Sequence, residues 1–169
     1  MIGYFPADFS WLKLFIMTDT TKKLLSRIRE ISSGIQERGK KAEQSAAAIR
    51  EFGAYRWVGL YDVDEHMVSI IAWSGPGAPA YPIFPVTKGL TSSAIREKKT
   101  VVTGDVRTDP RYLTAFGSTL SEIIIPILHP VDGRVIGTID VESEKANAFS
   151  PADQEMLEQC AHAAQSLWL

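Results

Sequence analysis

Hydrophobic residues recur with a helical period near both ends of the chain. Thr20 or Thr21 can cap a first helix, whose apolar stripe comprises Leu24, Ile28, Ile31 and Ile35. Glycines at 34 and 39 interrupt this pattern, and a second helix is predicted over 40–52. Near the C-terminus, Ser150 caps a helix that begins at Pro151 and has an apolar stripe at Leu157, Cys160, Ala161, Ala164 and Trp168. We expect this last helix to pack on a sheet.

The central part of the chain has the shorter period of β-strands. Runs at 55–63 and 66–73 flank a polar turn and predict a hairpin, and prolines bound an edge strand at 83–86. A short helix entered through Gly89, a strand in "TVVTGDV" and a loop at 105–119 follow. The stretches "LSEIIIPIL" and "RVIGTIDVES" then predict a second hairpin, with its turn at Asp132-Gly133. Because the pairings are mostly antiparallel and helices precede and follow the strands, we expect an α+β fold.

Length and composition favour one globular domain. The chain has 169 residues and is 45% hydrophobic, which is enough for a core. We expect a single domain over 20–169 and an N-terminal extension over 1–19, either disordered or preceding a later start at Met17. Membrane insertion is not expected, because no window reaches the ~18 consecutive apolar residues that a spanning helix needs.

The charge and the cysteine content limit the kinds of binding partner and the cellular compartment that we expect. The formal net charge is only -2, with acids and bases interspersed, so we do not expect a nucleic-acid partner. The basic residues between 21 and 50 indicate either a partner-binding face or the solvated side of a helix. A single cysteine excludes an intramolecular disulfide and fits a reducing compartment, so a cytoplasmic location is expected.

One face of the predicted sheet collects candidate ligand-binding residues. Asp140 and Glu142 are two positions apart and therefore point to the same side of a strand, as do Trp57 and Tyr61. Glu122 precedes the apolar run of a neighbouring strand. Two aromatic rings and three carboxylates can hold a small molecule that carries an ammonium group. The alternative is that the acids end strands in water while the aromatic rings belong to the core.

Other forms of chemistry lack a recognisable motif. The three histidines, His66, His129 and His162, have no metal-ligand spacing, and we find neither a catalytic triad nor a phosphate-binding glycine loop. Cys160 lies on the apolar stripe of the last helix, where we expect a small buried hydrophobic residue. We therefore expect no metal, no cofactor and no catalytic residue in these positions.

Four segments resemble the GAF domain family, and most closely its free methionine-(R)-sulfoxide reductase branch. They are "YRWVGLYDV", "FPVTKGLTSSAIREKKTVVTGDV", "SEIIIPI" and "DGRVIGTIDVESEKANAFSPADQEMLEQCA", and the resemblance spans about 20–168. It implies a six-stranded antiparallel sheet with the N- and C-terminal helices on one face and a ligand pocket on the other, roofed by 105–119. It also implies that Trp57, Tyr61, Glu122, Asp140 and Glu142 bind the ligand. The reductases have Asp at the last of these positions.

The chain departs from the reductases at their cysteines. The matching positions fall on Thr91 and on Ala115 or a neighbour, and neither segment contains a thiol. Sulfoxide reduction in that branch needs one thiolate to attack sulfur and a second to resolve the product. The leading hypothesis is a non-catalytic GAF domain that binds an amino-acid-like or other small molecule in signal transduction. A reductase or other acid–base enzyme, and a dimerisation module, remain open alternatives, and we expect a homodimer through the terminal helices.

Overall fold

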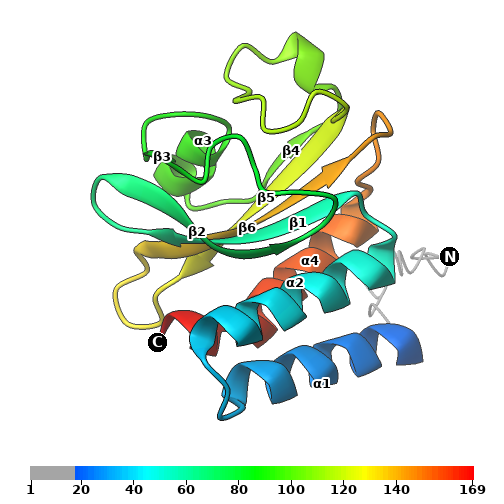
Figure 1. The fold of residues 1–169 in the computed structure, drawn as a ribbon, viewed down its shortest axis with the longest axis vertical. Coiled ribbons are helices and arrows are strands. Elements are labelled where there is room, and N and C mark those ends of the chain that lie inside the picture. The colour runs from blue at the N-terminus through cyan, green and yellow to red at the C-terminus, as the bar shows by residue number, and fades with distance from the viewer. Residues whose placement is uncertain (1–17) are drawn as a thin grey trace, which may run out of the picture.

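A six-stranded sheet organises residues 18–169, the part of the chain that this computed structural model describes (Figure 1). The strand order is β3-β2-β1-β6-β5-β4, and every neighbouring pair is antiparallel. Both predicted hairpins are present, and pairing of β1 with β6 joins them. The strands are β1 (Trp57–Val63), β2 (Met67–Ser74), β3 (Ile83–Pro85), β4 (Val101–Thr103), β5 (Ser121–Leu128) and β6 (Val135–Ser143).

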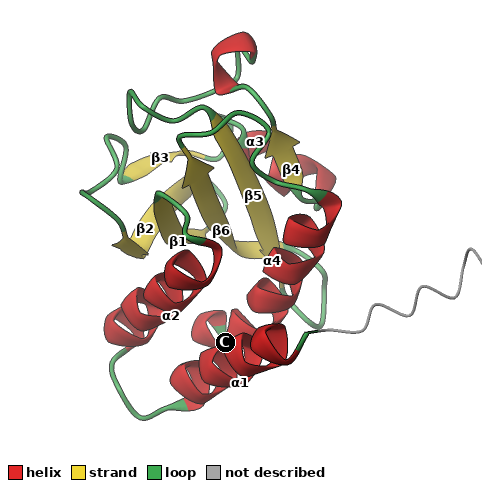
Figure 2. Ribbon diagram, turned by 90° about the vertical axis from the view of Figure 1, so that its right-hand side faces the viewer, coloured by secondary structure: helices red, strands yellow, loops and turns green. Residues whose placement is uncertain are grey.

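The long helices lie on one side of this sheet (Figures 1 and 2). Helix α2 (Arg38–Gly53) packs on β1 and β2, and α4 (Pro151–Ala164) packs on β5. Helix α1 (Asp19–Ser33) lies outside them, against α2 and α4. The short helix α3 (Thr91–Glu97) and the 3-10 turn η2 (Val106–Thr108) belong to the other side. The predicted α+β class, with terminal helices on one face, is confirmed.

The first helix differs from its prediction at both ends. Its N-cap is Thr18, whose hydroxyl accepts a hydrogen bond from the backbone N–H of Thr21 at 3.2 Å, so the predicted caps lie inside the first turn. The helix ends at Ser33, and Ile35 is fully exposed at 105%. Placing Ile35 on the buried stripe was therefore wrong, because the helix stops before the side chain can turn toward the core.

The second helix begins two residues earlier than predicted. Arg38 is its first residue because its guanidinium has partners on two other elements. It donates to both carboxylate oxygens of Asp62, at 2.8 and 2.5 Å, and to the carbonyl oxygen of Leu167 at 2.6 Å. Gly39 consequently lies within the first helical turn and does not separate the two helices.

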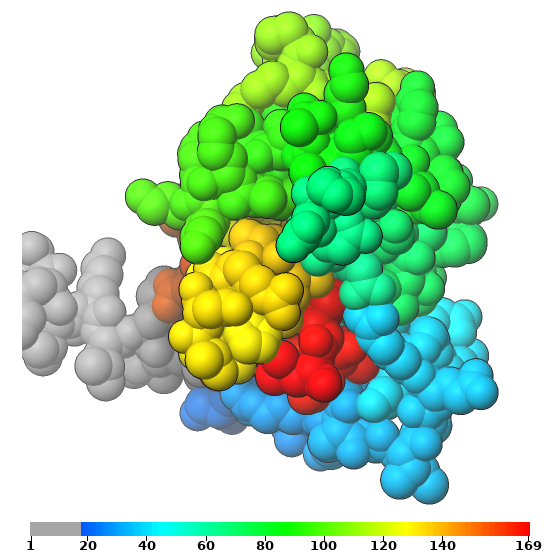
Figure 3. Space-filling model, turned by 90° about the vertical axis from the view of Figure 1, so that its left-hand side faces the viewer, coloured from blue at the N-terminus to red at the C-terminus, as the bar shows by residue number. Residues whose placement is uncertain are grey.

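The last helix matches its predicted start and buried stripe. Ser150 and Asp153 form a capping box, Pro151 is the first helical residue, and Leu157, Cys160, Ala161 and Ala164 are buried. The α-helix ends before Trp168, which lies in the 3-10 turn η3 (Gln165–Trp168) and donates its indole N–H to the carbonyl oxygen of Tyr61 at 3.0 Å. Figure 3 shows this C-terminal segment (red) between the β5–β6 turn (yellow) and the N-terminal helices (blue).

No helix within residues 18–169 combines the length and the apolar character needed to cross a membrane. The cytoplasmic location and the homodimer through the terminal helices stay predictions. The extension predicted over 1–19 lies outside the described residues except for its last two, which cap and begin α1.

Candidate ligand pocket

The register of three strands places the predicted residues on one face of the sheet. Trp57 of β1 is opposite Glu142 of β6, and Glu142 is in turn opposite Glu122 of β5. One step along the same face, Gly59 of β1 is opposite Asp140 of β6. The β5–β6 hairpin and the pairing of β1 with β6 therefore bring residues from distant parts of the chain into two adjacent rows.

These side chains line a small cavity on the face opposite the long helices. Its volume is about 30 Å³, which can hold a water molecule. The residues that line it are Trp57, Tyr61, Tyr81, Phe84, Gly89, Leu90, Thr91, Leu113, Ala115, Glu122, Asp140 and Glu142. All five predicted residues thus meet at one cavity, while their role as ligand-binding residues stays a prediction.

Aromatic rings form one wall of the cavity and are held in place. The indole N–H of Trp57 donates to the carbonyl oxygen of Gly77 at 3.0 Å. Gly59 makes room for this ring, because a Cβ at that position would lie 2.1 Å from Trp57 Cη2. Phe116 packs on Trp57 with ring centroids 5.5 Å apart, and Phe84 meets Tyr61 edge-on at 5.9 Å. Such packing fixes the rings before any ligand arrives.

The three carboxylates beside these rings, on the same face of the sheet, are all buried, with exposures of 8% for Glu122, 5% for Asp140 and 1% for Glu142. Glu142 accepts a hydrogen bond from the hydroxyl of Thr119. Asp140 Oδ1 has no hydrogen-bond partner among the described residues. Because a buried polar atom without a partner is costly, the cavity is suited to a donor that would reach this oxygen.

Burial makes these acids hard to ionise. It raises the pKa of Asp140 from 3.8 to about 7 and that of Glu142 from 4.5 to about 7. The pKa of Glu122 is also raised well above its usual value, first by burial and then by the neighbouring charges of Glu142 and Asp140. Burial and the same acids raise the pKa of Tyr61, which therefore stays a neutral phenol. The site can bind a cation or exchange protons near neutral pH.

The resemblance matches reductase cysteines to Thr91 and to Ala115 or a neighbour, and Thr91 and Ala115 both line the cavity. Thr91 begins α3 and Ala115 belongs to the loop over the cavity. The only cysteine of the chain, Cys160, is fully buried in the core on the helical side of the sheet, where its thiol lies 3.6 Å from Met156 Sδ. Burial raises the pKa of Cys160 to about 12. A thiolate at the cavity is therefore not available from this chain.

The loop at 105–119, which we call the roof loop, contributes to the lining of the cavity, and its path on the side of the sheet away from the long helices can be followed in Figure 1. Leu113 and Ala115 line the cavity, and Phe116 and Thr119 contact Trp57 and Glu142. The contributions of Phe84, Leu113 and Phe116 were missed in the sequence. None of the three had a usable signal in the sequence, because Leu113 and Phe116 lie in a loop and Phe84 stands between the apolar residues Ile83 and Pro85.

A larger groove of about 540 Å³ runs along the edge of the sheet between β5 and α4. Its charged lining residues, among them Lys98, Lys99 and His162, are exposed. It has no buried polar atom that calls for a partner, unlike the cavity over β1, β5 and β6. Within residues 18–169, no three or more His, Cys, Asp or Glu side chains converge closely enough to hold a metal ion.

The family model that describes the GAF domain matches residues 42–167, and the chain belongs to this family. GAF domain-containing protein A of Dictyostelium discoideum is 29% identical over 139 residues, covering 82% of this chain and 85% of the relative. The structure of free methionine-R-sulfoxide reductase from Neisseria meningitidis in complex with its substrate is similar, with a TM-score of 0.78 and 25% identity, covering 99% of this chain and 95% of that one. The type II enzyme from Thermoplasma acidophilum is 31% identical with a TM-score of 0.68, covering 78% and 95%.

Proposed function

We propose that this protein is a non-catalytic GAF domain that binds a small, amino-acid-like molecule through its ammonium group. The observation that carries this proposal is Asp140 Oδ1, which is buried without a hydrogen-bond partner among the described residues, beside two further carboxylates in the cavity that Trp57 and Tyr61 also line. An ammonium group donates three hydrogen bonds and carries the charge that offsets ionised acids. An aromatic wall adds cation–π attraction and buries the rest of the ligand.

Reductase relatives support the same ligand class, because the Neisseria meningitidis protein was seen with its substrate and its name identifies a methionine sulfoxide. The reaction itself would need thiols at the cavity. Thr91 and Ala115 supply none, and the thiol of Cys160 lies behind the sheet. A hydroxyl without an adjacent base is a poor nucleophile, so recognition without reduction is the simpler account.

An enzyme that uses the acids directly is the second candidate. It is favoured by Asp140 and Glu142, whose pKa values of about 7 would let either act as a proton donor or acceptor at neutral pH. This candidate predicts that the bound molecule is chemically altered, whereas a binding domain returns it unchanged.

A calorimetric titration with L-methionine-(R)-sulfoxide, with the (S) epimer as the control ligand, tests the proposal. We expect heat for (R) only, and a loss of at least tenfold in affinity for Glu122→Gln, which removes a carboxylate and keeps the shape. The matched control variant is Glu65→Gln, exposed in the β1–β2 turn. Equal affinity of the two variants would remove Glu122 from the binding site, and no heat with either epimer would exclude methionine sulfoxide as the ligand.

A further inference from the structure

The cavity as it stands is too small to hold an amino-acid-sized molecule. Ligand pockets for small molecules commonly enclose about 300 Å³ or more, and this cavity has about 30 Å³. The floor consists of sheet residues fixed by backbone pairing, whereas Leu113 and Ala115 come from the roof loop. A ligand can enter only if a segment above the floor moves, and the roof loop contributes more of the lining there than the β2–β3 connection, which supplies Tyr81.

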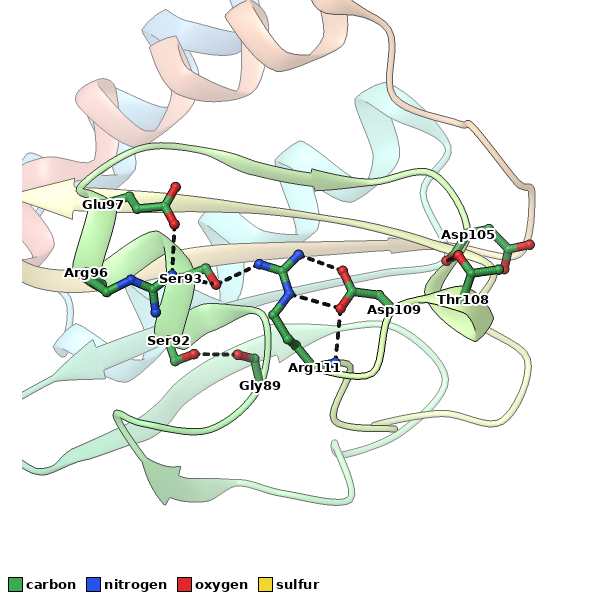
Figure 4. A network of polar contacts seen from close by, with 9 residues as sticks. All are labelled: Gly89, Ser92, Ser93, Arg96, Glu97, Asp105, Thr108, Asp109 and Arg111. Carbon is green, nitrogen blue, oxygen red and sulfur yellow. Dashed lines mark hydrogen bonds and ion pairs between the residues drawn. The ribbon is translucent and has the colours of Figure 1, made fainter.

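The roof loop is closed at its base, and above the base it is held by the packing of Tyr112, Leu113 and Phe116 and by few hydrogen bonds. At the base, Val106 donates its backbone N–H to the carbonyl oxygen of Leu120 at 2.9 Å. Near its end, the hydroxyl of Thr119 bonds to Glu142. In the middle of the loop, one side-chain hydrogen bond reaches another element: Arg111 Nη1 donates to Ser93 Oγ of α3 at 2.8 Å (Figure 4).

The geometry of Arg111 prepares it for this contact. Its Nε and Nη2 bind the two carboxylate oxygens of Asp109 at 2.9 and 2.6 Å, which leaves Nη1 to reach α3. Figure 4 shows the guanidinium held between Asp109 and Ser93. A forked Arg–carboxylate pair fixes the orientation of the group, so little entropy is lost when the third bond forms. The acceptor, Ser93, is 1% exposed and stays fixed in its helix.

We propose that the Arg111–Ser93 bond is a latch that holds the roof loop over the cavity and limits the rate at which a ligand enters and leaves. This rests on the proposed function, because a latch on access matters only where the cavity accepts a ligand. Release of one hydrogen bond on a partly exposed side chain is a small change, so the loop opens often while the sheet and its carboxylates keep their positions.

The same loop contains a matched control. Arg107 forms the same forked pair with Asp105, at 2.8 and 2.7 Å, and each aspartate also accepts the backbone N–H of its arginine at 3.0 Å. Among the described residues, the side chain of Arg107 hydrogen-bonds to Asp105 alone. Ser92 is the corresponding control for Ser93, because its hydroxyl donates to Gly89 within the same turn.

Hydrogen exchange of residues 112–119, measured by mass spectrometry on the full chain without ligand, tests the latch. We expect Arg111→Ala and Ser93→Ala each to speed exchange there about fivefold, which corresponds to the net contribution of one hydrogen bond. The double variant should be no faster than Arg111→Ala alone, since each change removes the same bond between the roof loop and α3. Exchange in β5 and β6 should stay at the wild-type rate.

Arg107→Ala and Ser92→Ala should leave exchange at 112–119 unchanged. The latch is refuted by unchanged exchange in Arg111→Ala, by an equal increase in Arg107→Ala, or by additive effects in the double variant. In a second arm, stopped-flow binding of L-methionine-(R)-sulfoxide should show association and dissociation both about fivefold faster in Ser93→Ala. Because the exchange arm uses no ligand, it decides the latch even where this probe does not bind.

Discussion

Replacing Asp140 by asparagine should remove the part of the pH dependence of stability that comes from this carboxyl. The folded protein holds a proton on this carboxyl up to about pH 7, whereas the unfolded chain releases it near 3.8. The folded state therefore binds more protons between these values, and stability falls as pH rises through that window. Asparagine has nearly the same shape and cannot ionise, so its stability should lack this fall.

The size of the effect follows from the shift in pKa. At about 1.4 kcal/mol per unit, moving the pKa from 3.8 to about 7 costs about 4 kcal/mol once the group is fully ionised. Between pH 5 and pH 8 the part that changes is about 2–3 kcal/mol. A buried amide without a partner costs about 1–3 kcal/mol, but that cost does not depend on pH. The quantity that tests the prediction is therefore the difference in the free energy of unfolding between variant and wild type, and how that difference changes with pH.

Urea unfolding followed by circular dichroism at pH 5, 6, 7 and 8 measures this difference. We expect the stability of Asp140→Asn to rise relative to that of the wild type at each step from pH 5 to pH 8. Glu65→Gln, which is exposed in the β1–β2 turn, should show the same pH dependence as the wild type. Parallel curves for Asp140→Asn and wild type would show that the carboxyl is ionised at ordinary cost in the folded protein. The description of the cavity as a site that resists charge until a cation arrives would then be wrong.

Two further predictions concern groups next to the site. Cys160 is fully buried with a pKa of about 12, so Ellman's reagent should modify it only in urea, and rapid labelling of the native protein would contradict its place in the core. Gly59→Ala should cost about 1–3 kcal/mol in urea unfolding, because its Cβ would overlap the ring of Trp57. Gly77→Ala meets no atom within 4 Å and should change stability by less than ~0.5 kcal/mol, and equal costs at the two glycines would count against the packing of Trp57.

Strand periodicity was sufficient to predict which residues meet at the cavity. Alternation along a strand places Trp57 with Tyr61 and Asp140 with Glu142, and a hairpin register then sets Glu142 opposite Glu122. A strand sequence predicts which residues share a face because side chains alternate between the two faces of a sheet whatever the rest of the fold is. The start of α4 could be predicted equally well, since Ser150 and Pro151 act locally.

Features that depend on distant contacts could not be predicted. The N-cap at Thr18 and the exposed Ile35 depend on where α1 begins and ends, which three threonines and a glycine leave ambiguous. The burial that raises the pKa values of the acids depends on Leu113 and Phe116, which a loop without periodicity brings over the sheet. The bond between Arg111 and Ser93 likewise joins residues 18 positions apart, and no motif in the sequence predicts that they meet.

The central claim is that the cavity recognises its ligand without transforming it, and one NMR sample tests both halves. Labelled protein is mixed with L-methionine-(R)-sulfoxide and excess dithiothreitol, and the indole Nε1–H signals and the ligand methyl signal are followed over several hours. We predict that the signal of Trp57, which lines the cavity, shifts with added ligand while the sulfoxide remains unchanged. Conversion to methionine would make the protein an enzyme, and a Trp57 signal that does not move would exclude this ligand from the cavity.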